Sequence, residues 1–268
     1  MQSTTGSEPK ASDGRKALCQ EQVDSFWHNG FLSIGKVLKD DEIALLRQEY
    51  DRTFAEAQAG KVQFRNLAID NTDDLEKKNK APQKMLQIMQ MCELNIHFRR
   101  LLYDERFLNI VEDLIGPNIQ LFHDQALFKP AHHGGPVHLH QDNAYWRCTP
   151  ANLVSIWLTL DDVNLDNGAM QFIPGSHLQA ISHDRAQSSN ALLDSSGHAD
   201  ESAIAVVDLP AGGITLHHCQ TLHKTAPNTT DRQRRALAIH YMPPGTRSLR
   251  SGDYLSVSFS RPMLRMRS

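Results

Sequence analysis

The sequence predicts a mainly β protein with flanking helices, and a change of pattern along the chain leads to that fold class. Before Pro117 the apolar residues recur at helical spacing. After it, short alternating or β-branched segments are separated by Gly, Pro, Asn and Asp, a pattern typical of a sheet in a sandwich or barrel. The predicted strands are 119–129, 137–140, 152–160, 169–173, 203–208, 213–218 and 234–242.

Four helices are predicted in the amino-terminal part of the chain. Residues 20–28 carry apolar residues at helical spacing, and Gly30 follows as a stop signal. A second helix begins at Asp40, and its apolar stripe is interpreted as core packing. Residues 93–102 and 104–115 also read as helices, the latter ended by Gly116-Pro117.

The length and composition favour one globular domain. A chain of 268 residues with 40% hydrophobic and 22% charged residues can bury a full core. Residues 1–16 are rich in Ser, Thr, Gly and Lys, so we expect a disordered tail followed by a single domain over 17–268.

Charge and cysteine usage narrow the class of partner and the compartment. A net charge of −3 argues against a protein that binds nucleic acid or a membrane surface, and no apolar run is long enough to span a bilayer. The amino-terminal residues lack the apolar stretch of a signal peptide. Four scattered cysteines without paired spacing predict reduced thiols in the cytoplasm.

One short stretch has metal-ligand spacing. In an extended strand residues two apart point to the same face, so His140 and Asp142 can reach one metal ion. A second histidine would complete a set of two histidines and one carboxylate, which suits non-haem Fe(II) because it leaves coordination positions open. The same spacing recurs at His198 and Asp200, but no strand pattern flanks that copy, so we interpret it as a solvated loop.

The remaining ligand is expected in residues 212–230, which contain His217, His218 and His223. Periodicity alone does not choose among these three histidines. The stretch leads into Arg234 and Arg235, which point to opposite faces of one predicted strand, so only one can face a pocket. A planar guanidinium there could bind a carboxylate through two hydrogen bonds.

Taken together, these motifs resemble a known family. Three motifs, in this order, look like those of the phytanoyl-CoA dioxygenase family. They are a His-x-Asp before an aromatic pair, an Asn-Gly-Ala-Met…Ile-Pro-Gly-Ser-His run at 167–177, and a His-x-Thr-x-x-Asn-x-Thr…Arg-Arg-Ala run from His223. The resemblance covers roughly residues 20–243. It implies a double-stranded β-helix (jelly-roll, cupin-like) core and an oxygenase that uses Fe(II), 2-oxoglutarate and O2.

Carried over to this chain, the resemblance assigns roles to individual residues. It makes His140, Asp142 and His223 the iron ligands, and His217 and His218 neighbouring groups. It favours Arg234 over Arg235 as the partner of the distal carboxylate of 2-oxoglutarate. Thr225 matches a hydroxyl that helps to hold this carboxylate, and Trp157 matches a position near the co-substrate.

The expected substrate contacts are Gln125, Trp146 and His138. Core packing explains Gln125, Trp146 and also Trp157 equally well, and a histidine at position 138 is more often only hydrogen-bonded nearby. Gln125 lies on the face of strand 119–129 that the resemblance turns into the barrel, together with His123, Leu127 and Lys129. The implied reaction is oxidation of a small-molecule metabolite, most simply hydroxylation, with release of succinate and CO2, and the resemblance suggests natural-product biosynthesis as its setting. The alternative is a non-oxidative metal-dependent cupin-type enzyme such as an isomerase, which needs no dicarboxylate clamp.

Overall fold

The computed structural model describes residues 15–187, 189 and 191–267, and two antiparallel sheets dominate it. Residues 1–14 of the expected disordered tail lie outside the described residues. The larger sheet has the order β1 (Phe31–Lys36), β12 (Gly213–His218), β7 (Val154–Thr159), β14 (Arg234–Met242), β4 (Ile119–Lys129), β3 (Leu86–Met89) and β2 (Arg65–Asn66), with β16 (Met263–Arg265) paired to β4. The smaller sheet has the order β11 (Ala205–Val207), β8 (Met170–Phe172), β13 (His223–Thr225) and β5 (Val137–His140).

Two further antiparallel pairs are β9 (Asp184–Arg185) with β10 (Leu193–Asp194), and β6 (Cys148–Thr149) with β15 (Arg247–Ser248). The predicted jelly-roll class is confirmed, since the sheet-rich core consists of antiparallel sheets whose neighbours are distant in sequence. The strands predicted over 119–129, 137–140, 213–218 and 234–242 have the observed bounds. The sequence pattern did not predict β3, which extends the larger sheet beyond β4.

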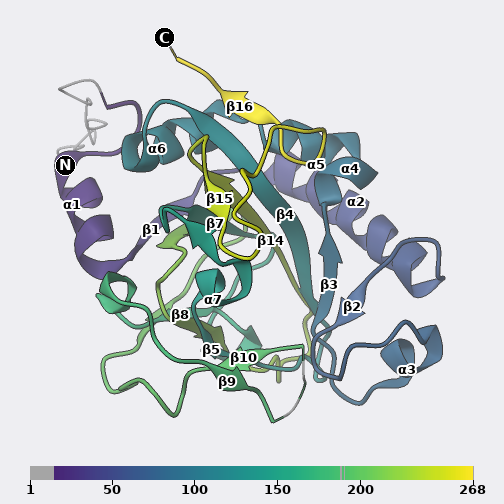
Figure 1. Cartoon of the computed structure of the whole chain (residues 1–268). Helices are drawn as coiled ribbons and strands as arrows, with labels where there is room; N and C mark the ends of the chain where they lie inside the picture. The colour runs from purple at the N-terminus through teal and green to yellow at the C-terminus, as the bar shows by residue number, and fades with distance from the viewer. Residues whose placement is uncertain (1–14, 188, 190, 268) are drawn as a thin grey trace, which may run out of the picture.

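The helices are α1 (Gln20–Asn29), α2 (Asp40–Gln58), α3 (Leu75–Lys80), α4 (Met91–Leu94), α5 (Ile96–Leu101), α6 (Glu105–Ile115) and α7 (Asp142–Trp146), with 3-10 turns η1 (Leu165–Asn167) and η2 (Ser176–Leu178). Figure 1 shows α2, α4 and α5 grouped on one side of the molecule, beyond β4. The helix predicted over 93–102 is two helices, because Asn95 is extended (φ −151°) and its side chain caps α5 by accepting a hydrogen bond from the His97 N–H. None of the described helices combines the length and apolarity needed to cross a bilayer.

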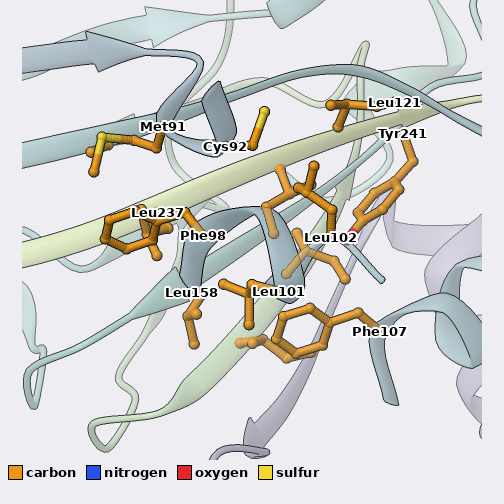
Figure 2. Packing of buried hydrophobic residues seen from close by; sticks show 14 of the residues in the cluster. Met91, Cys92, Phe98, Leu101, Leu102, Phe107, Leu121, Leu158, Leu237 and Tyr241 are labelled. Carbon is orange, nitrogen blue, oxygen red and sulfur yellow. The ribbon is translucent and has the colours of Figure 1, made fainter. Parts of the chain in front are cut away.

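The larger sheet separates two environments because side chains alternate along each strand. On β14, Leu237, Ile239 and Tyr241 point to the main apolar core, which the helices cover. Figure 2 shows this core, in which Phe98, Leu101 and Phe107 from α5 and α6 gather with Leu158, Leu237 and Tyr241 from the sheet. Arg234, Ala238 and His240, at the even-numbered positions of the same strand, line a cavity on the opposite face. The packing of one face therefore fixes which side chains reach the cavity.

Candidate active site

Three potential metal ligands converge at the end of the smaller sheet. His140 is the last residue of β5 and His223 the first of β13, and the two are cross-strand partners. Asp142 is the first residue of α7, and the candidate ligand atoms of the three residues all lie within 4.8 Å of one another. The expectation that His140 and Asp142 share a strand is therefore corrected. They keep the same side because the intervening Gln141 is extended (φ −104°, ψ 130°).

Backbone carbonyls orient both imidazoles. Nδ1 of His140 lies 2.8 Å from the carbonyl oxygen of His138, and Nδ1 of His223 lies 2.9 Å from that of Thr221. Since a carbonyl only accepts, Nδ1 carries a proton in each ring, which leaves Nε2 as the candidate ligand atom. These Nε2 atoms lie 3.6 and 3.8 Å from Oδ1 of Asp142. Two imidazole nitrogens and one carboxylate oxygen, with their outer hydrogen bonds in place, fit a non-haem Fe(II) ion.

The other oxygen of Asp142 is held by protein groups. Nε2 of His217 lies 3.2 Å from Oδ2, and Oγ of Ser155 donates to the same oxygen at 3.4 Å. Burial alone would raise the pKa of Asp142, but His223, His140 and His217 hold it well below its usual range. Asp142 is thus ionised, with one oxygen directed at the two imidazoles and the other engaged by His217 and Ser155.

Arg234 lies on the cavity side of β14 and is completely buried. Its Nη1 donates a hydrogen bond to the Leu127 carbonyl at 2.9 Å, whereas its Nε has no hydrogen-bond partner. Its guanidinium carbon lies 5.6 Å from the centre of the Trp157 ring. Burial lowers the pKa of Arg234 to about 10, so it stays charged at neutral pH. No carboxylate lies within ion-pair distance of it among the described residues. A buried cation without an anion is costly, so this pocket is suited to a bound carboxylate.

Arg235 points to the opposite face of the same strand. It forms ion pairs with Asp51 at 2.7 Å and Asp161 at 2.8 Å, on the side covered by α2. Of the two adjacent arginines, the structure therefore places only Arg234 in the cavity.

A buried lysine completes the surroundings of Thr225. Nζ of Lys129 donates to Oγ1 of Thr225 at 2.8 Å and also to the Ala226 carbonyl. Burial, with a contribution from the charge of Arg234, holds the pKa of Lys129 well below its usual range. Lys129 received no role from the sequence, although the alternation along strand 119–129 placed it on the inward face.

The cavity between the sheets has a volume of about 280 Å³ and contains both the ligand cluster and the arginine. Gln125, Trp146, Trp157 and Thr225 line it. The His138 ring is not part of the wall; it lies 3.6 Å from the Asp194 carboxylate, because β10 packs beside β5. His123, expected on the inward face of its strand, and His217, expected beside the ligand, also line it. Residues that line the cavity without any role from the sequence include Arg65, Gln87, Tyr145 and His240. In the second His-x-Asp motif, His198 pairs instead with Asp184 near the surface.

A model of the phytanoyl-CoA dioxygenase (PhyH) family matches residues 26–236. The chain belongs to this family. It is 27% identical over 252 residues to a probable alpha-ketoglutarate-dependent hypophosphite dioxygenase of Stutzerimonas stutzeri, covering 90% of this chain and 85% of that protein. It is 29% identical over 192 residues to the Caenorhabditis elegans homologue of phytanoyl-CoA dioxygenase domain-containing protein 1, covering 67% of this chain and 65% of the nematode protein.

Solved structures share the fold. A non-haem, alpha-ketoglutarate-dependent carbocyclase from nogalamycin biosynthesis superposes with a TM-score of 0.73 at 20% identity, covering 94% of this chain and 99% of the carbocyclase. An epimerase from nogalamycin biosynthesis, solved with Fe3+, alpha-ketoglutarate and nogalamycin RO, superposes with a TM-score of 0.74 at 21% identity, covering 92% of this chain and 98% of the epimerase. As a member of this family, the protein is a non-haem iron- and 2-oxoglutarate-dependent dioxygenase.

Proposed function

We propose that this protein oxidises a small-molecule metabolite in the cytoplasm, most simply by hydroxylation, through one domain formed by residues 17–268. The observation that carries the proposal is that one cavity holds both the His140, Asp142 and His223 cluster and the buried, unpaired cation of Arg234. A metal that keeps coordination positions open and a clamp for a dicarboxylate are the two requirements of this chemistry. All four cysteines are free thiols, as in proteins of a reducing compartment.

The protein groups act by binding and orientation. His140, Asp142 and His223 would hold the iron, and Arg234 with Thr225 would hold the distal carboxylate of 2-oxoglutarate beside Trp157. When bound, the iron would supply, together with 2-oxoglutarate and O2, the oxidising power for an unactivated C–H bond, and the co-substrate would be converted to succinate and CO2. Trp146 and Gln125 would contact the substrate from the part of the wall that also contains His123 and His240.

The outcome of the oxidation is a separate choice. Relatives in fold are named as a carbocyclase and an epimerase of natural-product biosynthesis, so ring formation or epimerisation of a metabolite is the second candidate. A non-oxidative isomerase is disfavoured, because it would leave the buried charge of Arg234 without an anion.

The test requires no substrate. The apo-protein is titrated with Fe(II) and 2-oxoglutarate without oxygen, and the visible charge-transfer absorption of the bound keto-acid is recorded. We expect the absorption in the wild type and in Arg235→Met, and its loss at matched 2-oxoglutarate concentration in Arg234→Met. Iron binding without this absorption in the wild type would refute the proposal and favour the non-oxidative alternative.

A further inference from the structure

A chain of hydrogen bonds links the candidate metal carboxylate to the wall of the cavity. Ser155 Oγ lies 3.4 Å from Asp142 Oδ2 and 2.6 Å from Nδ1 of His240. The other nitrogen of His240, Nε2, lies 2.9 Å from the side-chain nitrogen of Gln125, whose oxygen accepts from the side-chain nitrogen of Gln87. The chain therefore crosses the inner face of the larger sheet from β7 through β14 and β4 to β3.

The carboxylate fixes the direction of the first half of this chain. An ionised carboxylate only accepts, so the Ser155 hydroxyl must donate to Asp142. The Ser155 oxygen is then free to accept from His240, so Nδ1 of that ring carries the proton. Burial holds the pKa of His240 well below its usual range, so the ring is neutral and its Nε2 can only accept.

The same reasoning fixes both glutamine amides. Gln125 must present its NH2 group to Nε2 of His240, which turns its oxygen to Gln87. Gln87 must present its own NH2 group to that oxygen. Its Oε1 is then the last atom of the chain, and this atom is buried without a hydrogen-bond donor. Gln87 also lines the cavity, so the chain ends on an unsatisfied acceptor in a residue of the cavity wall.

We propose that this chain is a substrate-recognition element: Oε1 of Gln87 accepts a hydrogen bond from a hydroxyl or N–H group of the substrate, and the opposite end holds Asp142 in its ligating orientation. Ser155, His240 and Gln125 are positioning residues, because they act on Asp142 and Gln87 through one another. This inference rests on the proposed function and adds a substrate class to it, a molecule with a hydrogen-bond donor. An unsatisfied buried acceptor discriminates strongly against analogues that lack the donor.

The first experiment tests the Asp142 end. Co(II) replaces Fe(II), and its dissociation constant and visible absorption are measured with 2-oxoglutarate and without oxygen. We expect Ser155→Ala to weaken Co(II) binding about 10- to 100-fold and to shift the absorption, the typical effect of losing an outer partner of a metal ligand. Thr215→Val is the matched control, because Thr215 carries a buried hydroxyl without a hydrogen bond on the neighbouring strand β12. Unchanged binding in Ser155→Ala would overturn the positioning role, whereas no Co(II) binding by the wild type would overturn the proposed function itself.

The second experiment tests the Gln87 end with two isomeric probes. 1-Hexanol has a hydroxyl donor and methyl pentyl ether has none, and each is titrated into the Co(II) and 2-oxoglutarate complex while the absorption is recorded. We expect the alcohol to perturb the wild-type spectrum at a concentration at least about 10-fold lower than the ether, and Gln87→Met to abolish the difference. Equal effects of the two probes on the wild type, including no effect of either, would overturn the donor subsite. So would a preference for the alcohol that survives in Gln87→Met.

Discussion

Replacing Arg234 with methionine should remove the binding of 2-oxoglutarate and leave the fold intact. The guanidinium is buried, with a free Nε and only the Leu127 carbonyl as a partner, so a bound carboxylate would be its main counter-charge. Methionine preserves much of the apolar stem and removes the charge and all donors. Deleting one partner of a buried, hydrogen-bonded ion pair costs about 3–5 kcal/mol.

At about 1.4 kcal/mol per tenfold change, this loss weakens the binding of 2-oxoglutarate by about 100- to 4,000-fold. The dissociation constant is measured anaerobically with Fe(II) or Co(II) bound, and metal affinity is measured separately. We expect metal binding to be retained, because the two ligand histidines lie on the other sheet and Asp142 lies in α7.

Arg235→Met is the matched control, because it deletes the same side chain at the adjacent position. Its ion pairs to Asp51 and Asp161 lie on the helix-covered face, so it should lower the free energy of unfolding without weakening 2-oxoglutarate. The reasoning is refuted if Arg234→Met binds 2-oxoglutarate as the wild type does, or if Arg235→Met shows the larger loss of affinity.

Three further outcomes are expected. Replacing His140, Asp142 or His223 singly with Ala should weaken Fe(II) binding at least about 100-fold and leave the circular dichroism spectrum unchanged. The control variant His198→Ala should bind iron as the wild type does. Wild-type iron affinity in an Asp142 variant would contradict the ligand set. Phe107→Ala should lower the free energy of unfolding, measured by urea titration, by about 3–5 kcal/mol, because this ring is fully buried between α6 and the sheet. A loss below about 1 kcal/mol would show that the core does not depend on the ring. Burial lowers the pKa of His218 to about 4, so below pH 6.5 the unfolded chain binds a proton that the folded chain does not. The free energy of unfolding of the apo-protein should therefore fall by about 2 kcal/mol from this group between pH 6.5 and 5. His218→Gln should reduce that loss, and an unchanged dependence of stability on pH in the variant would contradict the prediction.

Local patterns were sufficient for most of the secondary structure. Strands such as 213–218 and 234–242 carry β-branched and apolar residues between turn signals, so their bounds follow from short-range preferences. β3 was missed because it is a short segment bounded by charged, irregular sequence, and only pairing with β4 makes it a strand. The single helix predicted over 93–102 failed because the side chain of Asn95 caps a new helix.

The sequence by itself determined a sheet of sandwich or barrel type and the opposition of Arg234 and Arg235, since these follow from residue type and a period of two. Its motifs implied the jelly-roll class through their resemblance to a known family. Tertiary structure decided which histidine meets His140, because the cross-strand register of β13 and β5 joins residues 83 positions apart. It also decided that His138 turns to Asp194, that His217 and Ser155 hold Asp142, and that Gln87 ends a hydrogen-bond chain. These contacts depend on distances between strands that are remote in sequence, and no local preference encodes such distances.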